Sequence, residues 1–361
     1  MKATRILRRP RVLIVGCGDV GLRCAQRLLA RAAQPRVIAL TTRPERATSL
    51  RAHGLTPIVG DLDAPRSLRR LAGIARTVLH LAPPPSTGAD DPRTQALIAA
   101  LGTRARYRAA RGSTSRTRRM RTAFAASHER ALRWPACGNR PARSSLNRRI
   151  VPEPPLAAGR SVRVRVVYAS TTGVYGDCAG ALIDETRPVR PANARAKRRV
   201  AAERRLRRAN VRGTTAASIV RIPGIYAQDR LPLARIHQGK PALVDADDVY
   251  TNHIHADDLA AIMVRVAEHG RIGRVVHASD DTVLKMGTYF DRVADAFGLP
   301  HVPRISRGTA EQTLDPMVLS FMRESRRLSN VRLRRELRVV LRYPTVDDFL
   351  RGVPSGAPDV K

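Results

Sequence analysis

Residues 11–21 read Arg-Val-Leu-Ile-Val-Gly-Cys-Gly-Asp-Val-Gly, and this stretch decides the fold. A short apolar run of strand length is followed by glycines that open an amphipathic helix, and apolar strands then alternate with helices as far as Leu101. The predicted strands here are Arg11–Val15, Val37–Thr41, Thr56–Val59 and Thr77–Leu81. The predicted helices are Val20–Ala33, Pro44–His53, Pro65–Leu71 and Asp91–Leu101. This alternation predicts a doubly wound parallel sheet, an α/β fold with helices on both faces.

The glycines follow the spacing G-x-G-x-x-G between a strand and a helix, which is the setting in which the motif is informative. Gly16 permits a tight turn, Gly18 lets the backbone approach a pyrophosphate, and Gly21 lets the helix pack closely on the strand. Asp19 and Val20 open the helix whose N-terminus would face the phosphates. The motif therefore predicts a Rossmann-type dinucleotide site, and the alternative is a glycine turn without a ligand.

The second half of the chain continues the pattern and then becomes mainly helical. Strands are predicted at Val162–Ala169, Thr215–Arg221 and Arg274–Ala278, with helices at Pro191–Arg208 and His255–His269. Further helices are predicted at Met286–Phe297, Thr309–Met322, Ser329–Leu337 and Thr345–Leu350. We therefore expect a Rossmann domain built from residues 1–101 and 160–280, followed by a small C-terminal lobe at 281–361.

Residues 102–159 interrupt the alternation. They hold fourteen arginines but only two acidic residues, Glu129 and Glu153. Their apolar residues keep no sustained period, so the composition predicts a disordered insertion with a helical turn around Thr122–Leu132 at most. A nucleic-acid arm and a poorly selected or misread coding stretch both stay open for this segment.

The formal net charge of +36 at pH 7 comes almost wholly from arginine, because lysine is nearly absent. Nucleic acid or a membrane surface would fit such a charge. The arginines are spread along the chain, however, and aromatic residues are too few to act as stacking platforms between them. We expect coding bias to explain the skew, and we do not expect nucleic-acid binding to be the main role.

The remaining composition indicates a cytoplasmic protein. The cysteines are scattered without a C-x-x-C pair, which suits reduced thiols and predicts no metal site. No apolar run approaches the roughly eighteen residues of a membrane span. The apolar run Val12–Val15 is too short for a signal-peptide core.

The end of the second predicted strand indicates which dinucleotide binds. An acidic residue about twenty positions after the glycines would hold the ribose hydroxyls of NAD. The chain has Thr41, Thr42 and Arg43 there. A guanidinium in place of the acid favours a 2′-phosphate, so we expect NADP, with NAD possible if Arg43 is only solvated.

The next two strand ends complete the predicted cofactor edge. Asp61 and Leu62 follow the third strand, where adenine contacts arise in such folds, although Asp61 could equally cap the following helix. Leu81, Ala82 and Pro83 end the fourth strand, beside the central groove.

Several segments together resemble an atypical extended short-chain dehydrogenase/reductase of the NAD-dependent epimerase/dehydratase family. They are G-C-G-D-V-G (16–21), V-G-D-L (59–62), Y-A-S-T-T-G-V-Y-G-D (168–177), E-T-R-P-V-R-P (185–191), R-I-P-G-I-Y (221–226), N-H-I-H-A-D-D-L-A (252–260) and the tail 325–344. The resemblance implies that the C-terminal lobe holds the substrate. It also implies that Thr171 is the catalytic hydroxyl, followed by Thr172, and that Ser170, Pro223 and Gly224 adjoin the cofactor.

The helix 191–208 lacks the tyrosine of the family's Tyr-x-x-x-Lys pair, in which tyrosinate acts as base and lysine lowers its pKa. If Glu203 sets the register, Arg195 stands at the tyrosine position and Arg199 at the lysine position. If Lys197 sets it, Asn193 stands at the tyrosine position. Arginine cannot cycle a proton near neutral pH, so Lys197 is the remaining candidate for proton transfer.

Two functions therefore stay open. The first is an oxidoreductase or epimerase acting on a small molecule, for which the resemblance implies a sugar-like or nucleotide-linked substrate. The second is a non-catalytic dinucleotide-binding sensor or scaffold without the tyrosine. We expect neither a membrane nor a nucleic acid as principal partner, and a homodimer stays open. The motif 252–260 carries His253, His255, Asp257 and Asp258, for which we expect structural roles.

Overall fold

The computed structural model describes residues 9–102 and 163–353. The predictions made for residues 103–159, including the helical turn at 122–132, lie outside the described residues. The described residues 9–102 and 163–353 belong to one compact unit. Among the described residues, no helix is long and apolar enough to cross a membrane.

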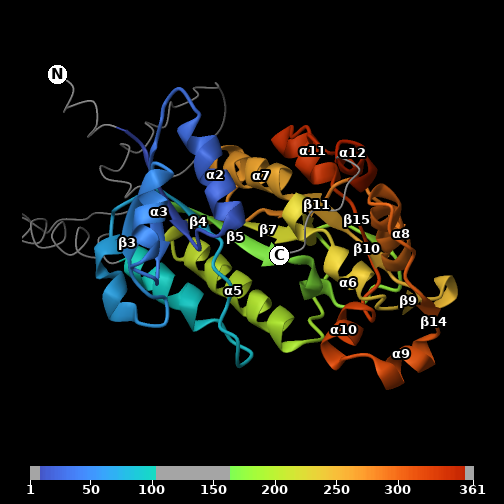
Figure 1. The fold of residues 1–361 in the computed structure, drawn as a ribbon. Coiled ribbons are helices and arrows are strands. Elements are labelled where there is room, and N and C mark those ends of the chain that lie inside the picture. The colour runs from blue at the N-terminus through green and yellow to red at the C-terminus, as the bar shows by residue number, and fades with distance from the viewer. Residues whose placement is uncertain (1–8, 103–162, 354–361) are drawn as a thin grey trace, which may run out of the picture. The chain divides into compact units, whose positions relative to one another are not determined.

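A seven-stranded parallel sheet forms the centre of this unit (Figure 1). Its order is β12-β7-β5-β4-β1-β2-β3, which confirms the predicted doubly wound fold. The strands are β1 (Arg11–Val15), β2 (Arg36–Thr41), β3 (Thr56–Val59), β4 (Thr77–His80), β5 (Val164–Thr171), β7 (Thr215–Ile222) and β12 (Val275–His277). Their carboxyl ends align, because Val15 pairs with both Leu40 and His80. The strand order reverses beside β1, where such folds bind ligands.

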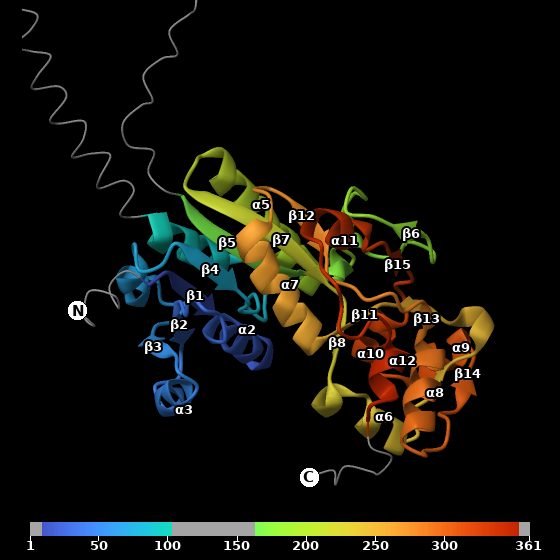
Figure 2. The ribbon, with the colours of Figure 1, turned by 90° about the horizontal axis from the view of Figure 1, so that it is seen from above.

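Helices cover both faces of this sheet (Figure 2). On one face lie α2 (Asp19–Leu29) and α7 (Ala256–His269), which share an apolar core with the inward side chains of β1, β2 and β5. On the other lie α5 (Ala194–Val211), the helical residues 92–102 and the 3-10 helix η1 (Pro65–Leu71). The helix α3 (Arg46–Ala52) connects β2 to β3.

Local signals explain where the helices begin and end. The helix α2 ends at Leu29, short of the predicted Ala33, and the connection to β2 contains Gln34 with a φ of 34° before Pro35. The helix α5 begins at Ala194, later than the predicted Pro191. Its N-cap is Asn193, whose Oδ1 accepts a 2.9 Å hydrogen bond from the backbone of Ala196.

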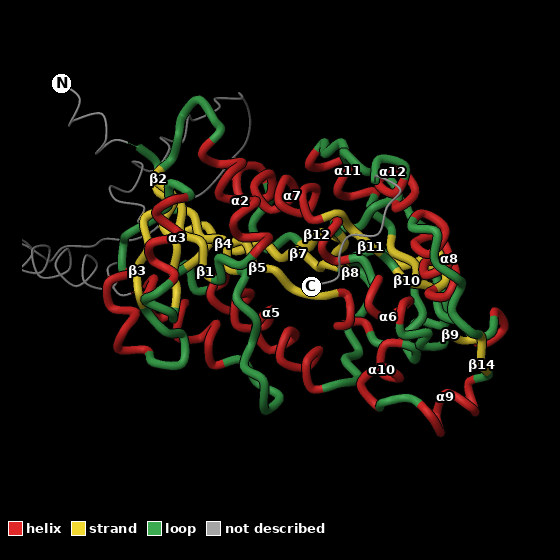
Figure 3. Tube along the Cα trace, in the orientation of Figure 1, coloured by secondary structure: helices red, strands yellow, loops and turns green. Residues whose placement is uncertain are grey.

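The C-terminal part contains short strands that the sequence did not reveal (Figure 3). They form two-stranded pairs: β8 (Gly224–Tyr226) with β11 (His253–His255), β9 (Ala242–Leu243) with β14 (Arg304–Ile305), β10 (Tyr250–Thr251) with β13 (Leu284–Lys285), and β6 (Leu182–Ile183) with β15 (Arg327–Leu328). Strands of two or three residues show no readable alternation, so only their distant partners define them.

The helices of this part are α6 (Leu233–His237), α8 (Met286–Ala296), α9 (Arg307–Thr313), α10 (Pro316–Phe321), α11 (Val331–Leu337) and α12 (Val346–Leu350). The single helix predicted over 309–322 is wrong: it is two helices, because Pro316 disfavours a helical conformation at the preceding residue.

The predicted domain boundary at residue 280 does not follow the packing. One apolar core joins Tyr226 and Ile236 to Phe290 and Phe349, so residues well before 280 belong to the lobe. Conversely, Leu333 of α11 packs in the core of the sheet. The reason is that the lobe is assembled by strand pairs between segments far apart in the chain.

Asp280 follows β12 and is buried between the sheet and the lobe, with 4% of its surface exposed. Its Oδ1 accepts a 3.0 Å hydrogen bond from the backbone of Thr282. Burial raises the pKa of Asp280 to about 7. The folded protein therefore retains a proton that the unfolded chain, with a carboxyl pKa of about 3.9, has already released.

We predict that Asp280→Asn flattens the pH dependence of stability. In the parent protein the free energy of unfolding should fall as pH rises from about 4 to about 7. In this range the folded protein binds a proton at Asp280 that the unfolded chain does not, so raising the pH favours the unfolded state. The amide carries no such titration. Urea unfolding at several pH values across this window measures the difference. If the free energy of unfolding changed with pH in the same way in parent and variant, the raised pKa of Asp280 would be contradicted.

Candidate functional site

The glycine loop after β1 has the geometry that its spacing predicts. Gly16 has a φ of 87°, and a Cβ there would lie 2.4 Å from the backbone nitrogen of Ala82. A Cβ on Gly21 would lie 3.0 Å from the carbonyl oxygen of Gly16. A Cβ on Gly18 would meet nothing within 4 Å. Turn and packing therefore require glycine at the first and third positions, while Gly18 borders open space.

That open space fits a phosphate group. Gly18 is the N-cap of α2 and offers no side-chain acceptor to the helix's first N–H groups. The Asp19 carboxylate is turned aside and accepts a 2.8 Å hydrogen bond from Arg23. The N-terminus of α2, with Val20 in its first turn, therefore presents backbone donors to an anion above Gly18.

The end of β2 differs in detail from the sequence prediction. Thr41 is buried, and its hydroxyl contacts the backbone N and O of Arg43, both at 3.2 Å, which shapes the turn. Thr42 and Arg43 are exposed. Arg46 in α3 instead reaches the glycine loop and donates a 3.1 Å hydrogen bond to the carbonyl of Cys17. Arg46 was not predicted from the sequence, although it lies only three residues beyond Arg43.

The residues that follow β3 and β4 make mainly structural contacts. Asp61 Oδ1 accepts a 2.9 Å hydrogen bond from the backbone of Asp63, so its side chain caps a turn, and Leu62 is buried in the core. The backbone nitrogens of Leu81 and Ala82 both donate to the carbonyl of Val15. The carbonyl of Pro83 accepts a hydrogen bond from Arg93.

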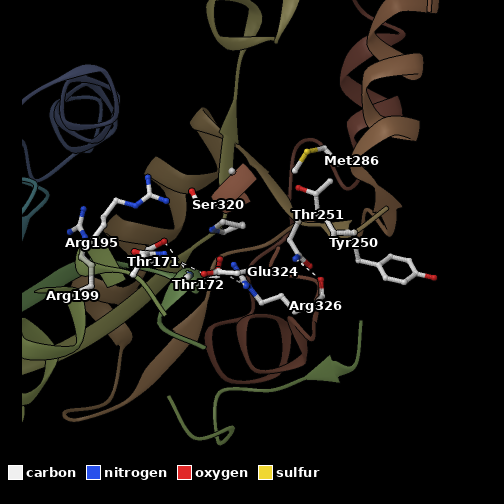
Figure 4. Close-up of a pocket in the computed structure, with 16 residues that line it drawn as sticks. Thr171, Thr172, Arg195, Arg199, Tyr250, Thr251, Met286, Ser320, Glu324 and Arg326 are labelled. Carbon is white, nitrogen blue, oxygen red and sulfur yellow. Dashed lines mark hydrogen bonds and ion pairs between the residues drawn. The ribbon is translucent and has the colours of Figure 1, made fainter. Parts of the chain in front are cut away.

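A cavity of about 320 Å³ opens where β5 and β7 end (Figure 4). It is lined by segments from the sheet, from α5 and from the lobe: Thr171, Thr172, Gly173, Asn193, Arg195, Arg199, Pro223, Gly224, Val249, Tyr250, Thr251, Asn252, Met286, Ser320, Glu324 and Arg326. The structure thus brings together four residues predicted from the sequence to lie at the active site or cofactor, namely Thr171, Thr172, Pro223 and Gly224.

Thr171 lines this cavity, and its hydroxyl accepts a hydrogen bond from a neighbouring backbone group. Thr171 ends β5 and caps the 3-10 helix η2 (Thr172–Tyr175), where its Oγ1 accepts a 3.3 Å hydrogen bond from the backbone of Gly173. Within the described part of the chain its hydroxyl hydrogen has no acceptor. Thr171 can therefore donate to a substrate oxygen, whereas Thr172 is buried beside it.

The helix α5 contributes arginines where the resemblance implies an acid/base pair. Arg195 and Arg199 line the cavity, which matches the register set by Glu203. Lys197 is exposed and does not line the cavity, so the proton-transfer role predicted for it has no geometric basis. The reason is helical geometry, because positions four apart share a face and a position midway between them does not.

Two charged residues from the lobe complete the cavity, and the sequence analysis missed both. Glu324 accepts hydrogen bonds from Asn193 Nδ2 at 3.3 Å and from Arg326 Nη1 at 2.9 Å. Arg326 Nη1 also donates to the carbonyl of Gly176 at 2.8 Å. A Cβ added to Gly173 would lie 3.8 Å from both Glu324 Oε2 and Thr171 Oγ1, so these two oxygens flank one spot.

His255 and Asp258, from the motif 252–260, have the structural roles expected of them. His255 Nδ1 accepts a 3.2 Å hydrogen bond from the backbone of Asp257 and so caps α7. Asp258 accepts from the backbone nitrogens of Arg342 and Tyr343 at 2.8 and 2.9 Å. These contacts tie the C-terminal segment to the sheet's helices.

A buried polar network lies behind the cavity. Glu203 is fully buried and accepts hydrogen bonds from Arg221 at 2.8 and 3.1 Å and from Ser170 at 2.7 Å. Ser170 was predicted to adjoin the cofactor, but its side chain is buried and serves this network instead. Arg221 donates to the Tyr175 hydroxyl at 2.7 Å, which lies 2.5 Å from His277 Nε2.

Electrostatics keep the Glu203 carboxylate of this network ionised, whereas its histidine is neutral. Burial would raise the pKa of Glu203, but the hydrogen bonds and charge of Arg221, with help from Ser170, hold that pKa below its usual range. Burial lowers the pKa of His277 to about 4, so its ring is neutral near pH 7. The ring then donates from Nδ1 to the carbonyl of Ser329, at 3.0 Å, and accepts from Tyr175 at Nε2.

Residues 12–278 match the family model of the NAD dependent epimerase/dehydratase family. No curated protein matches the sequence. The matched region spans the whole sheet, α2, α5 and α7, and thus both the glycine loop and Thr171.

Solved structures share the fold. A functionally unknown conserved protein from Silicibacter pomeroyi is 24% identical, with a TM-score of 0.66 over 94% of this chain and 96% of that one. A dTDP-glucose 4,6-dehydratase from Streptomyces venezuelae, with NAD bound, is 18% identical, with a TM-score of 0.64 over 94% and 95%. A nucleoside-diphosphate-sugar epimerase from Pseudomonas aeruginosa is 16% identical, with a TM-score of 0.63 over 95% of each chain.

We predict that Glu203→Gln lowers the free energy of unfolding by about 3–5 kcal/mol, because it leaves the Arg221 charge buried without a counter-ion. Urea unfolding measures the loss. Glu311→Gln is the matched control, since it removes an exposed pair with Arg323 and should cost no more than about 1 kcal/mol. Equal losses in the two variants would contradict the special status of the buried pair.

Proposed function

The chain belongs to the NAD dependent epimerase/dehydratase family, and from this premise we propose that it is an NADP(H)-dependent oxidoreductase or epimerase acting on a small hydroxy or oxo compound. It is an NAD(P)-binding protein of the epimerase type. One observation carries the proposal: Thr171, Pro223 and Gly224 converge on a cavity at the carboxyl edge of a parallel sheet whose first strand leads into the glycine loop.

The preference for NADP rests on Arg46 together with Arg43. No acidic residue stands at the end of β2, where NAD-binding sites hold the ribose hydroxyls. Arg46 is half-buried and already contacts the glycine loop, so its guanidinium lies beside the space above Gly18. A guanidinium fork suits the 2′-phosphate that distinguishes NADP.

The chemistry would take place beside Thr171. When bound, the cofactor supplies or accepts the hydride. Thr171 would donate its hydroxyl hydrogen to the reacting oxygen of the substrate and so orient it. Glu324 is the one carboxylate among the described residues that line the cavity, and it flanks the same spot as Thr171 Oγ1. We propose that Glu324, in place of the absent phenol, accepts or returns the proton.

The arginines at the expected acid/base positions support a second function, dinucleotide binding without catalysis. Arg195 and Arg199 face the cavity where an acid/base pair would stand, and arginine cannot exchange a proton near neutral pH. A protein that binds the dinucleotide and senses its redox state without turnover would tolerate this replacement. This non-catalytic sensor or scaffold is the alternative that the activity measurements below would favour if turnover is absent.

We also propose a small-molecule substrate, a cytoplasmic location and a homodimer as the assembly. The location is supported by Cys17, Cys24 and Cys178, which are buried free thiols of the kind found in reducing compartments. Whether the substrate is sugar-like or nucleotide-linked is part of the same proposal.

We predict that the protein binds NADPH more tightly than NADH, and that Arg46→Ala weakens NADPH binding by roughly tenfold or more, since hydrogen bonds to charged groups contribute about 1.5–3 kcal/mol. NADH affinity should hardly change. Fluorescence titration measures both. The control is Arg51→Ala, an exposed arginine in the last turn of the same helix. If Arg43→Ala alone abolishes the preference, Arg43 is the determinant and Arg46 is not.

We predict that Glu324→Gln lowers any NADPH-dependent turnover by about 10²–10⁴-fold, because a positioned acid or base typically contributes that much. Thr171→Val should lower turnover by up to about tenfold through one lost hydrogen bond. NADPH oxidation with a panel of ketosugars and aldehydes is the assay, and Glu311→Gln is the exposed control. A parent protein that binds NADPH but oxidises none of the panel would favour the sensor.

A further inference from the structure

Two guanidinium groups stand one helical turn apart on the cavity face of α5. Arg195 and Arg199 are separated by four residues, so their side chains share one face of the helix. Figure 4 shows both on the same side of the cavity, next to Thr171. Like charges at this spacing destabilise a helix slightly unless an anion lies between them. Two neighbouring guanidinium groups that line a cavity therefore favour the binding of a negatively charged group there.

Arg199 is anchored but keeps most of its donors. Its Nη1 donates to the carbonyl of Ala169 at 2.7 Å and contacts the Tyr168 hydroxyl at 3.3 Å. Its other guanidinium nitrogens have no partner among the described residues. An arginine carries five N–H donors in a rigid fork, so the anchored side chain can still engage a second acceptor.

Arg195 and Arg199 share the cavity with a further pair of charged residues. Arg326 and Glu324 form their own ion pair at 2.9 Å, and both side chains are only 12% exposed. The described residues that line the cavity include three arginines and one carboxylate, so an excess of positive charge faces its interior. The pKa of Arg195 lies below its ordinary value. Desolvation lowers it most, Glu324 raises it, and the neighbouring Arg199 and Arg198 lower it further.

We propose that the cavity binds a small organic anion, with the carboxylate or phosphate of the substrate held between Arg195 and Arg199 beside Thr171. This deepens the proposed function, on which it rests, by naming the substrate class: an acidic hydroxy or oxo compound rather than a neutral one. Bidentate recognition of carboxylate or phosphate is what guanidinium geometry favours. The cavity, at about 320 Å³, lies at the lower end of the range for small-molecule sites, about 300–1,000 Å³.

The test uses the full chain loaded with NADP⁺ and isothermal titration with three probes. Malonate carries carboxylates, inorganic phosphate carries phosphate oxygens, and malonamide is the neutral match for malonate. We expect one anion site per chain, filled by malonate or phosphate and not by malonamide. Whichever anion binds more tightly identifies the acidic group of the substrate.

Variants assign the site. Arg195→Gln and Arg199→Gln should each weaken the preferred anion by about tenfold or more, since each removes a charge-assisted hydrogen-bond donor. Arg204→Gln is the matched control, because Arg204 lies on the same helix but is exposed and does not line the cavity. This control also corrects for the high net charge of the protein.

The outcomes separate this inference from the proposed function. Equal binding by the parent and both cavity variants would overturn it, as would an equal loss in Arg204→Gln. Anion binding that occurs only without NADP⁺ would also overturn it, since the arginines would then serve the cofactor. NADPH titration runs in parallel: intact NADPH binding with no anion site refutes the anion inference alone, whereas absent NADPH binding refutes the proposed function.

Discussion

The buried ion pair between Glu203 and Arg221 is the interaction on which the architecture around the cavity depends. It joins α5 to β7, and through Ser170 and Tyr175 it reaches β5 and the turn after it, with His277 of β12 beyond. Removing two charges from water costs several kcal/mol per ion, so the pair is tolerated only with near-complete hydrogen bonding. Glu203 can keep these hydrogen bonds only if α5 is rotated about its axis so that Glu203 faces β7.

The rotation of α5 decides the chemistry of the cavity. With Glu203 turned inward, the residues four and eight positions earlier face the end of β5, and these are Arg199 and Arg195. Lys197, midway between them, points to solvent. From α5 the cavity therefore receives two positive charges and no phenol. In this chain the helix presents two arginines to the cavity, and Glu324 from the lobe is the one carboxylate among the described residues that line it.

The glycine loop and the cavity are parts of one edge of the sheet, and ion pairs link the start of α2 to α7. Asp19, directly after Gly18, pairs with Arg23, and Arg23 also pairs with Asp257 at the start of α7 at 2.5 Å. Because α7 follows β11, and β11 pairs with β8 beside the cavity, these contacts tie the glycine loop to the part of the sheet edge that borders the cavity. The dinucleotide proposed for this edge would meet both.

Sequence alone determined the features that depend on neighbouring residues. The alternation of apolar strands and helices, the glycine spacing and the hydroxyl run at Thr171 are local patterns, and they predicted the parallel sheet, the tight glycine turn and a strand that leads to the hydroxyl run. The strand β5 itself extends beyond the predicted end at Ala169, to Thr171. Tertiary structure decided the rest. The Glu324 contact with Asn193 joins residues 131 positions apart, and the lobe's two-residue strands exist only through distant partners. Arg46 and the arginine face of α5 gained their places from packing, because which side of a helix faces a cavity is set by what it buries and against which strand.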